Sequence, residues 1–273
     1  MPDVTMSPQV FAILSDLIEE RLGLCYAPAD KGLLEPKIAV RALELGFDSA
    51  LDYYYHLRYD DSTGTELNAL ADTLVVNETF FFREHDQVHA VLSTFVLPMI
   101  DRGLRPRIWC AACSTGEEPL TVAMWLADRG LLEQVDLVAS DISDIALAVA
   151  RAGRYRQRSL RQVPRDVDPA RWIEPERDAL IVHPRLRSAI RWHKLNLIDQ
   201  DAVRGMGEFD VILCRNILIY FRDETVRRVV SQLAGRLKAN GVLLVGVSES
   251  LMRFGTELKC EEHNGAFVYR KAP

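Results

Sequence analysis

Residues 107–119 read RIWCAACSTGEEP and pass from an apolar run through small residues and one glycine into an acidic segment. This pattern is typical of a buried strand that leads into a helix through a loop lying close to a ligand. Glu117 and Glu118 stand where a dinucleotide fold binds pyrophosphate, and carboxylates there repel phosphate. The site therefore suits a cationic cofactor without phosphate, such as S-adenosylmethionine. The alternative is that both glutamates only complement the helix dipole.

The composition is that of an ordinary globular chain. With 273 residues, of which 48% are hydrophobic and 26% charged, the chain is long enough for two domains. A net charge of -6 argues against a dedicated nucleic-acid-binding protein. The sequence shows no signal peptide and no apolar run of membrane-spanning length, which predicts a cytoplasmic protein without membrane insertion.

The five cysteines fit a reducing compartment better than a disulfide framework. Cys110 and Cys113 form a CxxC pair, which raises the alternative of a metal or redox site. Residues three apart on a strand face opposite sides, and neither a second pair nor a nearby histidine completes a zinc site. We therefore predict two core cysteines and no metal.

Residues 1–82 are predicted to form a helical domain, and residues 83–106 a linker helix. Ser7 precedes a proline in the manner of a helix N-cap, and apolar residues then recur at helical spacing until Gly23. Expected helices cover residues 8–22, 33–45, 51–60, 66–76 and 88–100.

Residues 77–87, NETFFFREHDQ, place three adjacent phenylalanines before Arg83. Three adjacent rings cannot share one helix face, so at least one is expected to turn away from the local core. Taken alone, these residues favour an aromatic hinge between domains. The alternative is an apolar pocket wall with a charge at its rim.

Residues 107–273 alternate between strand and helix patterns, which predicts an α/β domain with a doubly wound, mostly parallel sheet. Right-handed crossovers place Gly116, Asp141, Asn196 and Asn216 along one edge of this sheet, and we predict that the site lies there. Expected strands end at Asp141, Asn196 and Asn216; a helix covers residues 223–238 with Asn240-Gly241 as its stop, a further strand covers residues 241–250, and a terminal hairpin turns at Asn264-Gly265.

Asp141 follows the second strand, 25 residues after Gly116. Doubly wound folds place a carboxylate here to bind ribose hydroxyls. The alternative is a cap for the following helix, which begins at about Asp144.

The alternation is interrupted between about residues 155 and 192. This part is basic and rich in proline, and residues 179–190, ALIVHPRLRSAI, predict two short strands around a His183-Pro184 turn. We expect an inserted β subdomain. The six arginines between Arg151 and Arg165 either bind an acidic partner or form a solvated face.

Several blocks together resemble the chemotaxis receptor glutamate methyltransferases, or CheR family. They are NETFFFRE, AACSTGEEP, ASDIS, GRYR, VILCRNILIYF and GVSESL, in that order from about Asn77 onward. The resemblance implies a helical N-terminal domain (1–82), a linker helix (83–106) and a Rossmann-like methyltransferase domain (107–273) with the insert. It implies transfer of methyl groups from S-adenosylmethionine to receptor glutamates, leaving S-adenosylhomocysteine.

The resemblance also implies site residues, and it replaces the hinge interpretation of the phenylalanine segment. Arg83 and Tyr220 correspond to residues that flank the reacting methyl group. Two alternatives remain: a methyltransferase acting on another carboxylate or small molecule, and a non-catalytic signalling adaptor that binds the cofactor. The implied cofactor contacts are Asn77, Thr79, Arg83, Glu118, Asp141, Asn196, Leu197, Arg215 and Asn216.

The implied partner is the cytoplasmic helices of chemotaxis receptors, which a monomeric enzyme would methylate. In the family, receptor docking is attributed to a basic second helix. Here residues 31–46 offer only Lys31, Lys37 and Arg41, offset by two glutamates, so this attraction is expected to be weak.

Some family members hold a C-terminal receptor tether on the β subdomain and share a glycine-rich loop there. No glycine occurs between Tyr155 and Asn196. Because an added peptide strand needs that backbone freedom, we predict methylation that does not depend on a tether.

Overall fold

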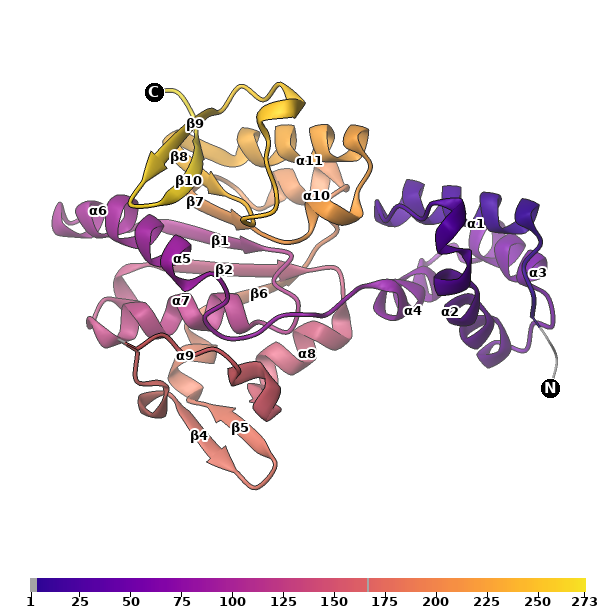
Figure 1. Ribbon diagram of the computed structural model, residues 1–273, viewed down its shortest axis with the longest axis horizontal. Coiled ribbons are helices and arrows are strands. Elements are labelled where there is room, and N and C mark those ends of the chain that lie inside the picture. Colours follow the sequence, from indigo (N-terminus) through magenta and orange to yellow (C-terminus); the bar gives the residue numbers. More distant parts are fainter. Residues whose placement is uncertain (1–3, 166) are drawn as a thin grey trace. The chain divides into compact units, whose positions relative to one another are not determined.

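The computed structural model describes residues 4–165 and 167–273 as two compact units (Figure 1). The first unit reaches Val76 and includes Tyr220–Thr225, and the second comprises Asn77–Ile219 and Val226–Pro273. Within the described residues, no helix is long and apolar enough to cross a membrane.

The first unit is helical, and its first helix shows why. Helix α1 (Pro8–Leu22) begins where the Ser7 hydroxyl oxygen accepts a hydrogen bond from the Val10 N–H at 3.2 Å. It ends at Gly23, which takes a φ of 78° that few other residues tolerate. Both predicted ends are confirmed. The other elements are η1 (Pro28–Asp30), α2 (Lys31–Glu44), α3 (Ala50–Tyr55), the π-helical turn η2 (His56–Asp60) and α4 (Thr65–Leu74).

The second unit is built on a seven-stranded sheet with the order β6-β2-β1-β7-β8-β10-β9. The first five strands in this order run parallel, and the last two form an antiparallel hairpin. This confirms the predicted fold class. The strands are β1 (Arg107–Ala111), β2 (Asp136–Asp141), β6 (Ile190–Lys194), β7 (Phe209–Cys214), β8 (Leu237–Leu244), β9 (Lys259–His263) and β10 (Ala266–Arg270).

Helices connect the parallel strands and enclose the core. Right-handed crossovers place the helices after β1 and β2 on one face and the helix after β7 on the other. The core includes the fully buried β-strand residues Ile108 and Leu213 together with Leu120 of the first connecting helix. The helical elements are α5 (His85–Val91), η3 (Leu92–Val96), α6 (Leu97–Asp101), α7 (Glu117–Asp128), η4 (Leu132–Gln134), α8 (Asp144–Ala152), α10 (Gln200–Gly205), η7 (Leu218–Tyr220), α11 (Asp223–Arg236) and η8 (Met252–Phe254).

The helix predicted to stop at Asn240-Gly241 ends earlier than expected. Helix α11 ends at Arg236 and β8 begins at Leu237, so both residues of the supposed stop lie inside a strand. Asn240 has a φ of 64°, and the register between β7 and β8 shifts there. Asn240 therefore occupies an irregularity in the pairing of β7 with β8, where asparagine fits because it tolerates the left-handed region.

The insert is a small sheet, but its strands differ from the prediction. The strand expected after the His183-Pro184 turn is wrong, because Pro184 opens a short helix and His183 accepts the hydrogen bond of its N-cap. The hairpin partner comes from residues before the apolar run instead, and the hairpin projects from the rest of the unit (Figure 1). The elements are β3 (Arg154–Tyr155), η5 (Gln157–Leu160), η6 (Pro169–Arg171), β4 (Ile173–Glu176), β5 (Ala179–Val182) and α9 (Pro184–Ser188), with the sheet order β3-β5-β4.

Candidate functional site

The strand order fixes where a ligand can bind. The connection from β1 leads to β2 on one side, whereas β7 lies on the other side of β1 and leads on to β8. In doubly wound sheets, ligands bind beyond the carboxyl ends of the strands at such a reversal. The ends of β1 and β7 therefore define the candidate site, as the sequence predicted.

The loop between β1 and α7 is sharply turned. Ala112, Ser114 and Gly116 have φ angles of 57°, 50° and 90°, all in the left-handed region. Such conformations are unfavourable for residues with a Cβ atom and concentrate at functional sites. A Cβ added to Gly116 would lie 2.6 Å from the Cβ of Ala150, so this glycine allows the loop to pack on α8.

Asp141 ends β2 and fastens this loop. One carboxylate oxygen accepts the Ser114 N–H at 2.7 Å, and the other accepts the Ser143 N–H at 2.9 Å. The side-chain cap of α8 is the Ser143 hydroxyl, which accepts the Ala146 N–H at 3.0 Å. The carboxylate of Asp141 is thus fixed at the sheet edge by backbone N–H groups, in the place expected for a ribose-binding acid.

The two glutamates that open α7 have different surroundings. Glu117 is buried and accepts a hydrogen bond from the Thr115 hydroxyl at 2.6 Å, and burial raises its pKa. Glu118 forms an ion pair with Arg215 across the sheet edge. Glu118 thus has a specific role, because it pairs with the cation that follows β7. Complementing the helix dipole alone would not require this pairing.

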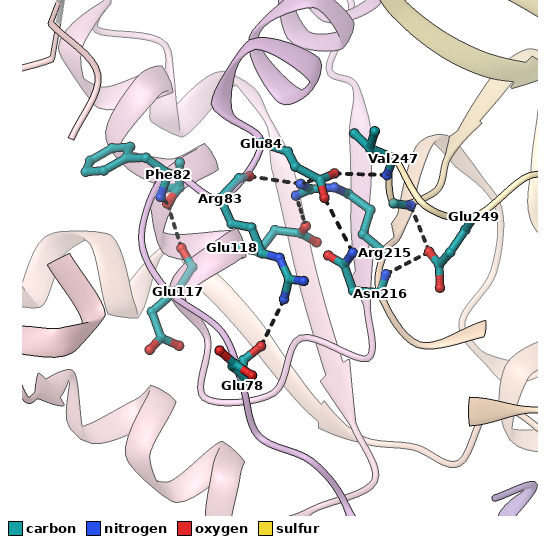
Figure 2. Close-up of polar contacts among 12 residues, drawn as sticks. Glu78, Phe82, Arg83, Glu84, Glu117, Glu118, Arg215, Asn216, Val247 and Glu249 are labelled. Carbon is teal, nitrogen blue, oxygen red and sulfur yellow. Dashed lines mark hydrogen bonds and ion pairs between the residues drawn. The ribbon is translucent and has the colours of Figure 1, made fainter. Parts of the chain in front are cut away.

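Arg215 is the centre of the β7 end of the site (Figure 2). Its side chain is only 2% exposed. One Nη atom pairs with Glu118, and the other donates to Glu84 at 2.9 Å and to the carbonyl oxygen of Arg83 at 2.8 Å. Its Nε atom is buried without a hydrogen-bond partner among the described residues. The two carboxylates and the carbonyl oxygen stabilise the buried guanidinium, because desolvating an unpaired charge is costly.

This cluster shifts the pKa values of its members. Burial alone would raise the pKa of Glu84, but Arg215 and hydrogen bonds from Val247 and Asn216 outweigh it and lower that pKa. Burial raises the pKa of Glu118 against the opposing effect of Arg215. The two carboxylates raise the pKa of Arg215, which stays a cation.

Glu249 stabilises the backbone that follows β7, and the sequence analysis did not assign it a role. Its carboxylate accepts the backbone N–H groups of Asn216 at 2.7 Å, Leu218 at 2.7 Å and Gly246 at 2.8 Å (Figure 2). A Cβ on Gly246 would lie 2.6 Å from the side-chain Nδ2 of Asn216 and 3.0 Å from its backbone nitrogen, so a larger residue here would displace Asn216. Glu84 was also missed, although both glutamates lie within NETFFFRE and GVSESL, two of the blocks that carry the family resemblance.

The phenylalanine segment borders this cluster. Phe81 and Phe82 belong to the hydrophobic core of the unit, whereas Phe80 lies outside that cluster, with the guanidinium of Arg161 4.1 Å from its ring centroid. Arg83 donates to the carbonyl oxygen of Glu78 at 2.9 Å. Two of the three rings thus pack into the core, and Phe80 lies beside the guanidinium groups of Arg161 and Arg83.

The remaining predicted residues have the following surroundings. Asn77 accepts the Ser114 hydroxyl at 2.9 Å, which joins it to the β1 loop. Strand β6 ends at Lys194, two residues before its predicted end, so Asn196 lies in the turn beyond it. Tyr220 belongs to the first unit, in which its carbonyl oxygen accepts the Cys25 N–H at 2.9 Å. Thr79 is half-buried, and Leu197 is buried.

Cys110 and Cys113 lie within the core, as predicted. Cys110, Cys113 and Cys214 are buried and unbonded to one another. Across residues 4–165 and 167–273, no cluster of three or more histidine, cysteine or acidic side chains is placed to hold a metal ion.

The chemistry of these side chains fits S-adenosylmethionine better than a phosphate-bearing nucleotide. Residues 77–160 contain no lysine, and the helix after the loop opens with two carboxylates instead. Phosphate sites need cations and free N–H groups at such a helix start. Carboxylates such as Asp141 suit hydroxyl groups and positive charge.

Comparison with known proteins identifies the family. Residues 77–266 match the family model described as "CheR methyltransferase, SAM binding domain", so S-adenosylmethionine is the cofactor. Chemotaxis protein methyltransferase 2 of Vibrio cholerae is 30% identical, over 94% of this chain and 90% of that protein. A chemotaxis protein methyltransferase of Vibrio parahaemolyticus is 30% identical over 99% of both chains, and chemotaxis protein methyltransferase 1 of Pseudomonas aeruginosa is 34% identical over 74% of this chain and 76% of that one. The chain belongs to the CheR methyltransferase family.

Proposed function

We propose that this chain transfers the methyl group of S-adenosylmethionine to glutamate side chains of chemotaxis receptors and forms methyl esters. The observation that carries the proposal is the fixed cluster around Arg215 at the reversal of strand order, inside the part that matches the family model. The relatives of nearly equal length are named chemotaxis protein methyltransferases.

The proposed cofactor contacts are the nine residues that the family resemblance implies. Asp141 would accept ribose hydroxyls, because its carboxylate is already aimed by two backbone N–H groups. Arg215 would hold Glu118, with which it forms an ion pair, and the adjacent Asn216 in position for the cofactor. The proposed set is Asn77, Thr79, Arg83, Glu118, Asp141, Asn196, Leu197, Arg215 and Asn216.

When bound, S-adenosylmethionine supplies the methyl group on a sulfonium cation. A glutamate side chain has a reference pKa near 4.3 and is a carboxylate at neutral pH, so the chain needs no general base. Its residues have to align the two groups and exclude water, because opposite charges that disappear during the reaction react more readily in a poorly solvating site. Phe80, which lies outside the core cluster and beside the guanidinium of Arg83, suits that requirement.

Arg83 and Tyr220 are the proposed catalytic residues, and each has a positioning role. An arginine that held the substrate carboxylate tightly would stabilise the ground state more than the transition state. Arg83 is therefore assigned to positioning cofactor and substrate. Tyr220 is assigned to orienting the carboxylate or the methyl group, and neither residue acts as an acid or base.

The proposed organisation follows from the same family. A helical domain (1–82), a linker helix (83–106) and the methyltransferase domain (107–273) would act together as a cytoplasmic monomer on receptor helices. We also propose that no receptor tether is needed, since the insert lacks glycine between Tyr155 and Asn196. Titration with receptor C-terminal peptides tests this: micromolar binding centred on residues 155–195 would contradict it.

The decisive experiment uses methyl-labelled cofactor and membranes that carry a chemoreceptor. We expect label on the receptor that mild base releases, because carboxyl methyl esters hydrolyse there and methylated amines do not. Membranes without receptor are the control. Label that resists base, or label confined to small molecules, would favour the alternative of a methyltransferase with another acceptor.

A further inference from the structure

The proposed reaction does not account for the arginines of residues 151–165, here called the basic segment. The segment contains no acidic residue, although the chain carries a net charge of -6. Residues 1–76 are strongly acidic, with 13 Asp and Glu against 5 Lys and Arg. Positive charge is therefore concentrated in one short stretch. Its arginines are Arg151, Arg154, Arg156, Arg158, Arg161 and Arg165.

The basic segment is attached directly to the candidate site. The Tyr155 hydroxyl donates to the carbonyl oxygen of Thr115 at 2.7 Å, in the loop after β1. The Phe81 N–H donates to the carbonyl oxygen of Ser159 at 2.8 Å. The backbone of the segment is thus held against both the loop after β1 and the phenylalanine segment, so its charges border the candidate site.

The arginine side chains of the segment are available to a partner. Arg156, Arg158 and Arg165 are exposed, and none forms an ion pair with an acidic side chain in the described part of the chain. Arg154 and Arg161 each pair with one exposed glutamate, at 3.3 and 3.1 Å. Exposed pairs of this kind contribute little, so a more acidic partner can replace them.

The basic residues of α2, in contrast, are already engaged within the first unit. Lys31 pairs with a glutamate one turn away at 3.5 Å. Lys37 donates to the carbonyl oxygen of Leu74 at 3.0 Å, and Arg41 donates to Glu66 at 2.9 Å. This helix offers little positive charge to an acidic partner.

We infer that the exposed arginines of the basic segment form the surface on which the acidic face of the receptor helices docks. The inference rests on the proposed function, because an acceptor glutamate is ionised and its substrate region is anionic. A protein with a net negative charge repels such a substrate unless a local positive surface adjoins the site. The basic segment is that surface.

The test replaces two unpaired arginines in the whole protein, Arg156→Ser with Arg158→Ser. The control, matched in the charge removed, is Arg105→Ser with Arg204→Ser, of which Arg204 forms an exposed ion pair with Asp201 at 3.1 Å. Both arginines are also exposed, and they precede β1 and β7, at the opposite edge of the sheet. The probe is a purified cytoplasmic fragment of a chemoreceptor. Base-labile methylation is measured against fragment concentration, and cofactor affinity is measured by calorimetry.

We expect the Arg156/Arg158 variant to raise KM for the fragment about 3- to 10-fold, with kcat and cofactor affinity unchanged. The difference from wild type should shrink at about 0.5 M salt, because screening weakens attraction between exposed charges. The control variant should keep the wild-type KM.

The outcomes separate the two proposals. Wild-type protein that forms no base-labile label overturns the proposed function, and the docking surface with it. Active wild-type protein whose KM rises equally in both variants, or in neither, overturns the docking surface alone.

Discussion

Two corners of the same sheet edge are built in opposite ways. At the end of β2, the carboxylate of Asp141 is held by backbone N–H groups of Ser114 and Ser143. At the end of β7, the guanidinium of Arg215 is held mainly by the carboxylates of Glu118 and Glu84. The first corner holds a single charge with uncharged hydrogen-bond donors, whereas the second depends on a balance of buried charges. Disturbing the second corner should therefore affect the fold itself.

The largest effect is expected from Arg215→Met. Glu118 and Glu84 would lose a cation whose side chain is only 2% exposed, so the free energy of unfolding should fall by about 3 to 5 kcal/mol. Urea denaturation measures this. Arg154→Met removes an exposed ion pair with Glu176 and should cost no more than about 0.5 kcal/mol. Equal losses in the two variants would show that the β7 corner is no more dependent on its charge than the surface is.

Asp141→Ala tests the other corner. Loss of a charged acceptor should weaken cofactor binding by about 1 to 3 kcal/mol. Calorimetry measures the affinity, with Asp144→Ala as a control that removes a neighbouring exposed carboxylate. Unchanged affinity in a folded Asp141→Ala variant would remove this residue from the site.

The Tyr220→Phe variant tests whether the Tyr220 hydroxyl takes part in the reaction. A group that orients the reacting atoms affects the rate and not the ground-state affinity, so kcat should fall about tenfold with cofactor affinity retained. Receptor methylation and calorimetry, performed on one preparation, give both values. A fully active variant would end the assignment.

The smallest effect concerns acid stability. The pKa of Glu84 is lower in the folded protein than its ordinary value near 4.3, so its contribution to stability is fully present above that value. The contribution is lost as pH falls through the lower folded pKa. Between pH 7 and pH 3.5, wild type should lose more unfolding free energy than Glu84→Gln. Glu176→Gln, at an exposed site, should follow wild type.

The same two corners show what sequence can predict. Asp141 was predictable because its position after a strand and its distance from Gly116 are local features. The helix ends at Ser7 and Gly23 and the hairpin at Asn264-Gly265 were predictable for the same reason. Two local signals were misinterpreted, because each is compatible with two structures. Asn240-Gly241 lies in a strand and does not end the helix, and Pro184 opens a helix where a turn between strands was expected.

The partners at the β7 corner could not be predicted from local pattern. Glu84 lies 131 residues from Arg215, and Glu249 lies 33 residues from Asn216. Only the strand order brings these side chains together. Motif blocks identified the stretches that matter, but the pairing of charges between blocks required the structure.

The rate at which thiol reagents label the buried cysteines can measure how often this site opens. Burial raises the pKa of the Cys110, Cys113 and Cys214 thiols well above the ordinary value, so they stay protonated and out of reach of thiol reagents. Cys25 and Cys260 are partly exposed and should react first. The slower labelling of the other three then reports how often the sheet opens at its central strands β1 and β7. Because a bound cofactor stabilises only the folded state, adding it should slow that labelling in proportion to its affinity.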